Sequence, residues 1–77
     1  MKSVKIKLDK VDDVQKFVTT ASKYKELDLK SGRYIVSASS LMGIFSLDLS
    51  GSVKLCYPDD IEQFINKDFS KWIVLER

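Results

Sequence analysis

The sequence predicts an α+β domain, in which a four-stranded antiparallel sheet carries its helices on one face. Four short segments alternate apolar and polar residues with a period of two, which is typical of half-buried strands. Other segments repeat apolar residues three and four positions apart, as amphipathic helices do. The predicted order is strand, helix, strand, strand, helix, strand, helix. One sheet covered by helices is the natural packing for that order.

The first strand and the first helix have the clearest patterns. Residues 2–8 alternate, with lysine and serine opposite the apolar set, which indicates a strand with one solvated face. The first helix is expected to begin at Asp9, because the next acids, Asp12 and Asp13, then oppose the positive end of the helix dipole. Lys23 and Lys25 are expected to close the helix at its negative end. Its predicted apolar stripe contains Val11, Val14, Phe17, Val18, Ala21 and Tyr24.

A hairpin, a fourth strand and a last helix follow. Alternating residues 27–30 and 33–38 flank Ser31-Gly32, a tight-turn signal, and the second of these strands is expected to direct Tyr34, Val36 and Ala38 to one face. Residues 53–57 alternate again. Pro58 and two acids favour a helix start. The stripe of this helix is expected to contain Ile61, Phe64 and Ile65. Residues 71–75 are expected to form an extended tail; the alternative is that Phe69 and Trp72 continue a helical stripe.

The composition limits the function. Residues 1–77 suffice for a single small domain, and a net charge of +2 is too small to indicate a nucleic-acid or membrane partner. With no histidine, one cysteine and three scattered glycines, the chain has neither a zinc-ligand pattern nor a phosphate-binding loop. We therefore expect no cofactor, no metal and no enzymatic activity. Lysines interrupt residues 2–7, so no secretory leader is expected, and a lone cysteine is typical of the reducing cytoplasm.

The segment from Ser37 to Leu49 contains more apolar residues than a short helix can bury. A helix of about ten residues has a buried stripe roughly 100° wide. Ser40 lies where an N-cap belongs, since its hydroxyl can accept a hydrogen bond from an unpaired N–H of the first turn. If Ile44 and Leu47 face the sheet, the remaining large apolar residues are expected to be exposed or at the border. These residues are Leu41, Met42 and Phe45. The alternative is that the C-terminal tail, with Trp72 and Ile73, folds back over them.

The same segment resembles a known family. Ser40-Leu41-Met42-Gly43-Ile44-Phe45-Ser46-Leu47 resembles the serine-centred segment of the histidine phosphocarrier (HPr) family of the bacterial sugar phosphotransferase system. Thr20-Ala21-Ser22-Lys23-Tyr24 resembles the end of that family's first helix. The resemblance covers most of the chain in length and element order. It implies the HPr-like open-faced β-sandwich, β-α-β-β-α-β-α.

The resemblance fails at the residue that gives the family its name. The histidine that accepts phosphate in the family corresponds to Lys10 here, when the chain is anchored on residues 20–24. Val11, Asp12 and Asp13 then occupy the positions of the alanine, arginine and proline that follow the histidine. Lysine offers no imidazole nitrogen as a nucleophile, and aspartates would repel an incoming phosphoryl group. Phosphohistidine transfer is therefore not expected.

The resemblance also implies a regulatory role for Ser40. In some Gram-positive members a dedicated kinase phosphorylates the matching serine, and the phosphoprotein binds a transcriptional regulator. Ser40 is thus a candidate phosphosite in the control of carbon metabolism, but serine is also a common N-cap and would suit this position for structural reasons alone. The matching apolar positions dock partners in the family, which implies a binding surface at Leu41, Met42 and Phe45. The implied partners are an HPr-type serine kinase, a transcriptional regulator or phosphotransferase components. The alternative is a constitutive interaction module of the same fold without phosphorylation.

Overall fold

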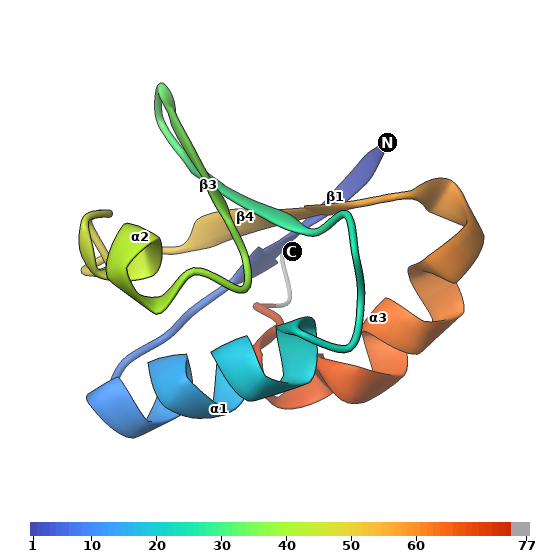
Figure 1. Cartoon of the computed structure of the whole chain (residues 1–77), viewed down its shortest axis with the longest axis horizontal. Coiled ribbons are helices and arrows are strands. Elements are labelled where there is room, and N and C mark those ends of the chain that lie inside the picture. The colour runs from blue at the N-terminus through green and yellow to red at the C-terminus, as the bar shows by residue number, and fades with distance from the viewer. Residues whose placement is uncertain (75–77) are drawn as a thin grey trace.

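The structure, a computed structural model, describes residues 1–74 (Figure 1). One sheet of four antiparallel strands has the order β1-β4-β2-β3. The strands are β1 (Lys2–Ile6), β2 (Asp28–Ser31), β3 (Tyr34–Ser37) and β4 (Val53–Tyr57). The helices are α1 (Val11–Ala21), α2 (Leu41–Phe45) and α3 (Glu62–Asp68), with 3-10 turns η1 (Asp59–Ile61) and η2 (Ser70–Trp72). The predicted element order and antiparallel sheet are confirmed.

The helices leave one face of the sheet open. In Figure 1, α1 and α3 lie together below the sheet, and α2 lies at the end of the sheet near β3. α2 contacts both β3 and α1. The face of the sheet turned away from α1 and α3 is therefore free of helices along the described chain.

The strand register fixes which side chains reach the core. Leu55 of β4 lies directly between Val4 of β1 and Leu29 of β2. Leu55 and Leu29 are fully buried, so this row faces the helices. Successive strand residues point to opposite faces, and the next row along must therefore face solvent. That row begins with Lys5, Lys54 and Lys30.

An aromatic cluster fastens α1 to the C-terminal part of the chain. The ring centroid of Phe17 in α1 lies 5.2 Å from that of Phe69 and 5.6 Å from that of Trp72. All three side chains are buried. Offset or edge-to-face pairs at such distances contribute about 0.5–1.5 kcal/mol beyond the burial of apolar area. The cluster holds α1 and the end of α3 against each other beneath the sheet.

The start of α1 differs from the sequence prediction. The helix begins at Val11, with Lys10 rather than Asp9 as the flanking residue, and Asp13 Oδ2 accepts the Lys10 N–H at 3.3 Å. A carboxylate three residues into the helix thus satisfies the backbone just outside it. Val11 is exposed and does not belong to the apolar stripe. The helix ends at Ala21, so Tyr24 packs against the core from the following loop.

Three other expectations were wrong in part. α2 has five residues, about half the expected length. Phe64 is exposed and does not belong to the buried stripe of α3, whereas Ile65 is fully buried as predicted. Tyr34 is exposed although it alternates with Val36 and Ala38, because the hairpin tip extends beyond the helices in Figure 1. Gly32 at that tip has φ +60°, at the first central position of the two-residue turn, where glycine has no steric cost.

The C-terminal segment becomes extended later than predicted. Residues 70–72 form η2, and the chain then pairs with β1. The Lys7 N–H donates to Trp72 O and the Val74 N–H donates to Lys5 O, each at 2.9 Å. The extended tail is confirmed for residues 73–74. The remaining predicted position, Leu75, lies outside the described residues.

A half-buried hydrogen bond between Tyr24 and Asp68 allows the fold to be tested at alkaline pH. The Tyr24 hydroxyl donates a hydrogen bond to the Asp68 carboxylate, which together with burial raises the pKa of Tyr24 to about 12 from 10.0. The bond needs the protonated phenol, so its contribution is complete below pH 10 and is lost as the pH rises towards 12. The difference in unfolding free energy between wild type and Tyr24→Phe should therefore shrink over this range, measured by urea unfolding. Tyr34→Phe, at an exposed site, is the control; identical pH profiles for wild type and Tyr24→Phe would contradict the pairing.

Candidate functional site

Helix α2 begins at the predicted cap. Ser40 has extended backbone angles, and its Oγ accepts the Gly43 N–H at 3.2 Å. Its carbonyl accepts the Ile44 N–H at 3.0 Å, which closes the first turn. The predicted role of Ser40 as an N-cap is therefore confirmed. The side chain is half-buried, with its hydroxyl turned to the helix backbone.

Gly43 allows this short helix to lie close to the sheet. A Cβ at Gly43 would stand 3.0 Å from Ser40 Oγ and 3.2 Å from Val36 Cβ. Glycine inside a helix costs roughly 0.5–1 kcal/mol relative to alanine. Here the missing side chain leaves room for the cap hydroxyl and for β3 at the same time. A glycine within a helical pattern is visible in the sequence, but the neighbour that requires it, Val36, is determined by tertiary packing.

Three apolar side chains of α2 form an exposed surface, which we call the α2 patch: Leu41, Met42 and Phe45. Their exposed fractions are 37%, 83% and 44%. Ile44 and Leu47, by contrast, are buried in the core, as expected from their spacing. The expected division of α2 into a buried and an exposed side is confirmed. Docking of a partner on the exposed side stays a prediction.

The described C-terminal segment does not cover the α2 patch. Trp72 is buried against Phe17 and Phe69, and Ile73 pairs with Ile6 at the β1 edge. The alternative in which Trp72 and Ile73 fold back over α2 is therefore wrong for residues up to 74. The patch stays open to solvent.

The loop before α1 holds the position that corresponds to the family histidine. Lys10, Val11 and Asp12 are exposed, and Asp13 caps the Lys10 backbone N–H. Lys10 thus lies between Asp9, whose carboxylate pairs with Lys7, and the acids Asp12 and Asp13 in the first turn of α1. Lysine offers no imidazole nitrogen as a phosphoryl acceptor, and carboxylates repel phosphate.

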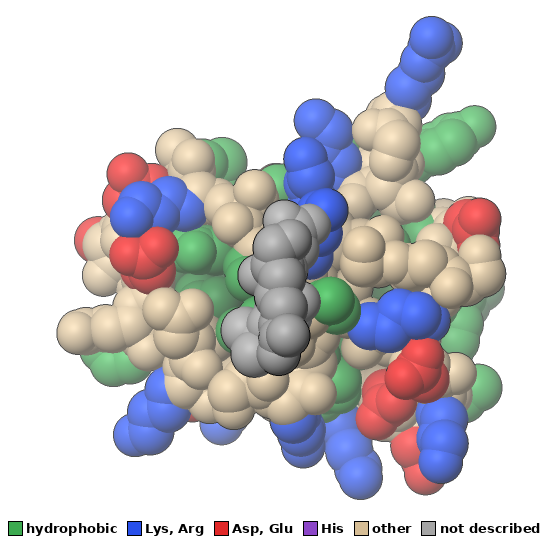
Figure 2. Space-filling model, turned by 180° about the vertical axis from the view of Figure 1, so that it is seen from behind, with side chains coloured by type: hydrophobic (Ala, Val, Ile, Leu, Met, Phe, Trp, Pro, Cys, Tyr) green, Lys and Arg blue, Asp and Glu red, His purple; other side chains and the backbone are tan. Residues whose placement is uncertain are grey.

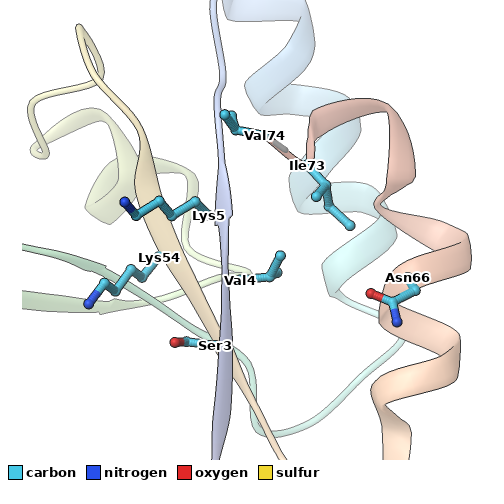
Figure 3. Close-up of a pocket in the computed structure, with 7 residues that line it drawn as sticks. All are labelled: Ser3, Val4, Lys5, Lys54, Asn66, Ile73 and Val74. Atoms are coloured by element: carbon cyan, nitrogen blue, oxygen red, sulfur yellow. The ribbon is translucent and has the colours of Figure 1, made fainter. Parts of the chain in front are cut away.

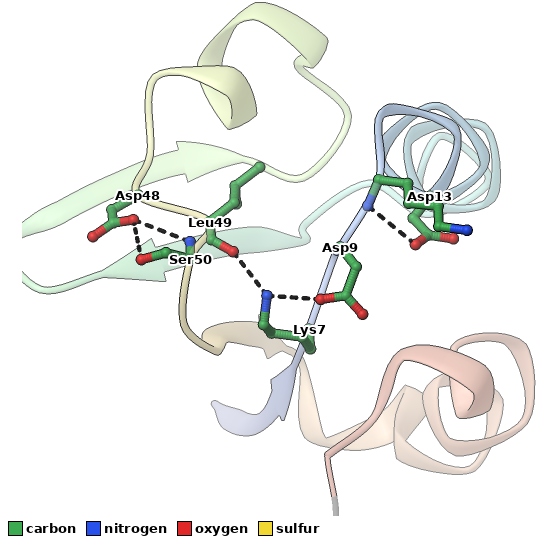
Figure 4. A network of polar contacts seen from close by, with 7 residues as sticks. Lys7, Asp9, Asp13, Asp48, Leu49 and Ser50 are labelled. Atoms are coloured by element: carbon green, nitrogen blue, oxygen red, sulfur yellow. Dashed lines mark hydrogen bonds and ion pairs between the residues drawn. The ribbon is translucent and has the colours of Figure 1, made fainter.

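Polar contacts join this loop to the segment after α2 (Figure 4). Lys7 Nζ donates to Leu49 O at 3.0 Å and pairs with Asp9 Oδ1 at 2.8 Å. Asp48 Oδ1 accepts from both the N–H and the hydroxyl of Ser50, and these hydrogen bonds lower the pKa of Asp48. Lys7 therefore holds the start of α1 beside the end of the α2 segment. In the sequence Lys7 belongs to the solvated face of the first strand, and its backbone acceptor Leu49 is 42 residues away.

A hollow at the β1 edge does not gather a reactive set of side chains. Figure 3 shows Lys5, Lys54 and Ser3 on one side of β1, whereas Val4 points to the opposite side, where Ile73 and Asn66 lie. Within residues 1–74, no group of three or more His, Cys, Asp or Glu side chains is placed to hold a metal ion. No helix in the described chain has the length and apolarity to cross a membrane.

One solved structure is similar to this chain over nearly its whole length. It is described as "Crystal structure of HPr-C-His from Thermoanaerobacter tengcongensis", is 32% identical and has a TM-score of 0.75. The match covers 92% of this chain and 89% of that one. This chain belongs to the HPr family. No family model and no curated protein matches it.

Two regions described above can now be compared with the HPr family. The α2 segment from Ser40 to Leu47 and the Lys10 loop are the regions that the resemblance assigned to regulation and to phosphoryl transfer. They lie at the same end of the molecule, where Figure 1 shows α2 above the beginning of α1. The chain keeps serine at the first region and has no histidine at the second or elsewhere.

Proposed function

We propose that this HPr-family protein carries no phosphohistidine and acts as a cytoplasmic regulatory module that binds proteins, without enzymatic activity. The observation that carries the proposal is a contrast between two neighbouring regions. The Lys10 loop has lost the chemistry of a phosphoryl acceptor, while α2 keeps a capping serine and an exposed apolar patch. A carrier needs the first region, whereas a binding module needs only the second.

Ser40 is the proposed regulatory phosphosite in the control of carbon metabolism. A phosphoserine carries about −1.5 to −2 charges at neutral pH and three acceptor oxygens. At Ser40 these charges would lie next to Leu41 and within reach of the Gly43 N–H that the hydroxyl now engages. A helix of five residues contributes little dipole, so the effect is a local change of charge beside the α2 patch. Partner choice would change with little change of fold.

The proposed partners are proteins of three kinds: an HPr-type serine kinase, a transcriptional regulator and phosphotransferase components. Methionine and aromatic side chains suit such contacts, because they adapt to different surfaces and bury large areas. Met42 and Phe45 provide both types in the exposed patch.

A constitutive interaction module is the second candidate. The α2 patch favours it, because the patch is exposed in the unphosphorylated chain and needs no modification to be available. Mass spectrometry of the protein isolated from its native cell separates the candidates. Phosphate on Ser40 under some nutrient condition supports the switch, and an unmodified pool under all conditions supports the constitutive module.

The first prediction concerns phosphoryl transfer. Incubation with the general phosphotransferase enzyme and labelled phosphoenolpyruvate should leave the protein unlabelled, because Lys10 and its neighbouring acids offer no acceptor. A histidine-containing HPr in the same reaction is the positive control. Acid-labile label on this protein would overturn the proposal.

The second prediction concerns Ser40. An HPr-type serine kinase should label the wild type and not Ser40→Asn. Asparagine is the better control than alanine, since it keeps an N-cap acceptor, whereas Ser40→Ala should cost about 1 kcal/mol of stability. Equal labelling of wild type and Ser40→Asn would reject the site. No labelling of either would reject the switch and leave the constitutive module.

The third prediction concerns the α2 patch. Phe45→Ala should weaken partner binding by about 1–3 kcal/mol, the range for an interface anchor. Its unfolding midpoint should barely move, because the side chain is already 44% exposed. Calorimetric titration with an HPr-type serine kinase, one of the proposed partners, measures the first effect, and urea unfolding measures the second.

Phe64→Ala is the matched control for Phe45→Ala. Phe64 is 48% exposed on α3, away from α2, and its truncation should leave partner binding unchanged. A large loss of stability in Phe45→Ala with unchanged affinity would make Phe45 a core residue and remove the α2 patch from the interface.

A further inference from the structure

The open face of the sheet carries a row of lysines in direct cross-strand register. Lys54 of β4 lies opposite Lys5 of β1 on one side and opposite Lys30 of β2 on the other. Figure 3 shows Lys5 and Lys54 projecting to the same side of the sheet, away from α1 and α3. Figure 2 shows Lys and Arg side chains gathered above the middle of the molecule on the same side.

This arrangement has an electrostatic cost in the free protein. Directly opposed side chains on neighbouring strands have Cβ atoms about 4.5–5.5 Å apart, and like charges in such pairs destabilise a sheet. Within residues 1–74, neither Lys30 nor Lys54 forms an ion pair or a side-chain hydrogen bond. A solvated strand face needs only polar residues, and it does not need cations on adjacent strands. An anion between Lys30 and Lys54 would remove the repulsion.

A hollow of about 300 Å³ lies at these two lysines. Its lining offers hydrogen-bond donors: the ammonium groups of Lys30 and Lys54, two serine hydroxyls and the backbone of the hairpin turn. No carboxylate of residues 1–74 lines the hollow; Asp28 lies on the same face but in the next row, opposite Cys56. The lining residues are Lys5, Lys30, Ser31, Gly32, Ser52 and Lys54.

We propose that this hollow binds a small organic molecule with two phosphate groups, or a diphosphate. Ammonium and hydroxyl donors match phosphate oxygens, and no carboxylate of residues 1–74 competes for them in the lining. The volume suits a small ligand, and a net charge of +2 for the whole chain gives no extended field for a polymeric anion. The site needs only Lys30 and Lys54 from the row, and it does not depend on phosphorylation of Ser40 or on the α2 patch.

Inorganic pyrophosphate is the probe. Added to the full chain at constant ionic strength, balanced with sodium chloride, it should cause saturable shifts of the Lys30, Gly32 and Lys54 backbone amide signals in NMR spectra. Lys54→Gln and Lys30→Gln should each weaken binding about tenfold, as expected for the loss of one charge-assisted hydrogen bond. Lys54→Arg should keep binding within about threefold, because it keeps the charge. Lys67→Gln, a lysine on α3, is the matched control and should bind as the wild type does.

Each alternative has its own outcome. Shifts that grow linearly, or that chloride alone reproduces, would overturn the site. Equal weakening in Lys67→Gln would reduce the effect to net charge and also overturn it. Tighter binding of a single-stranded oligonucleotide than of pyrophosphate would replace the small ligand by a nucleic acid. Without ligand, Lys54→Gln should unfold at the same urea concentration as the wild type or a higher one, so loss of binding in a folded variant is attributable to the site.

Discussion

The register of β4 between β1 and β2 is the constraint on which the rest of the structure depends. Because side chains alternate along a strand, the pairing that buries Leu55 between Val4 and Leu29 also exposes Lys54. A slip of one residue would bury the lysine row and expose the core row, at a large free-energy cost. The core and the open face are thus two consequences of one pairing. The helices can pack on only one side, and the other side is left for solvent or for a ligand.

Much of the fold could be predicted from the sequence, because hydrophobic periodicity and helix capping depend on residues that are close in the chain. The alternation of apolar and polar residues indicates the two faces of each strand, and the serine at position 40 indicates the N-cap of α2. The burial of some residues could not be predicted, because it depends on how far each element extends relative to its neighbours in the folded chain. Tyr34 alternates with Val36 and Ala38 but lies at a hairpin tip that extends beyond the helices, and Phe64 is exposed although its neighbour Ile65 is buried. The need for glycine at position 43 could not be predicted, because it depends on the close approach of Val36 in β3.

The candidate site could be predicted less well than the fold. The exposed side of α2 could be predicted, since five large apolar residues cannot share one narrow stripe. The bridging role of Lys7 could not be predicted; its ammonium group contacts the backbone carbonyl of Leu49 and the carboxylate of Asp9. That contact joins the loop after α2 to the start of α1. Neither segment has a sequence pattern that indicates contact with the other, and the contact forms only in the folded chain.

The position of Lys10 explains how an HPr fold can persist without its histidine. Lys10 is exposed and flanks α1, so its side chain contributes nothing to the buried cluster around Phe17. The cap there is made by Asp13 through the Lys10 backbone, which any residue except proline supplies. The acceptor chemistry can therefore be lost without a cost to the core. The α2 patch is different, because Ser40 and Gly43 hold it through contacts with helix and sheet, and altering them alters the fold around it. The binding surface proposed at α2 thus depends on residues that also stabilise the helix, whereas the Lys10 side chain lies apart from the core.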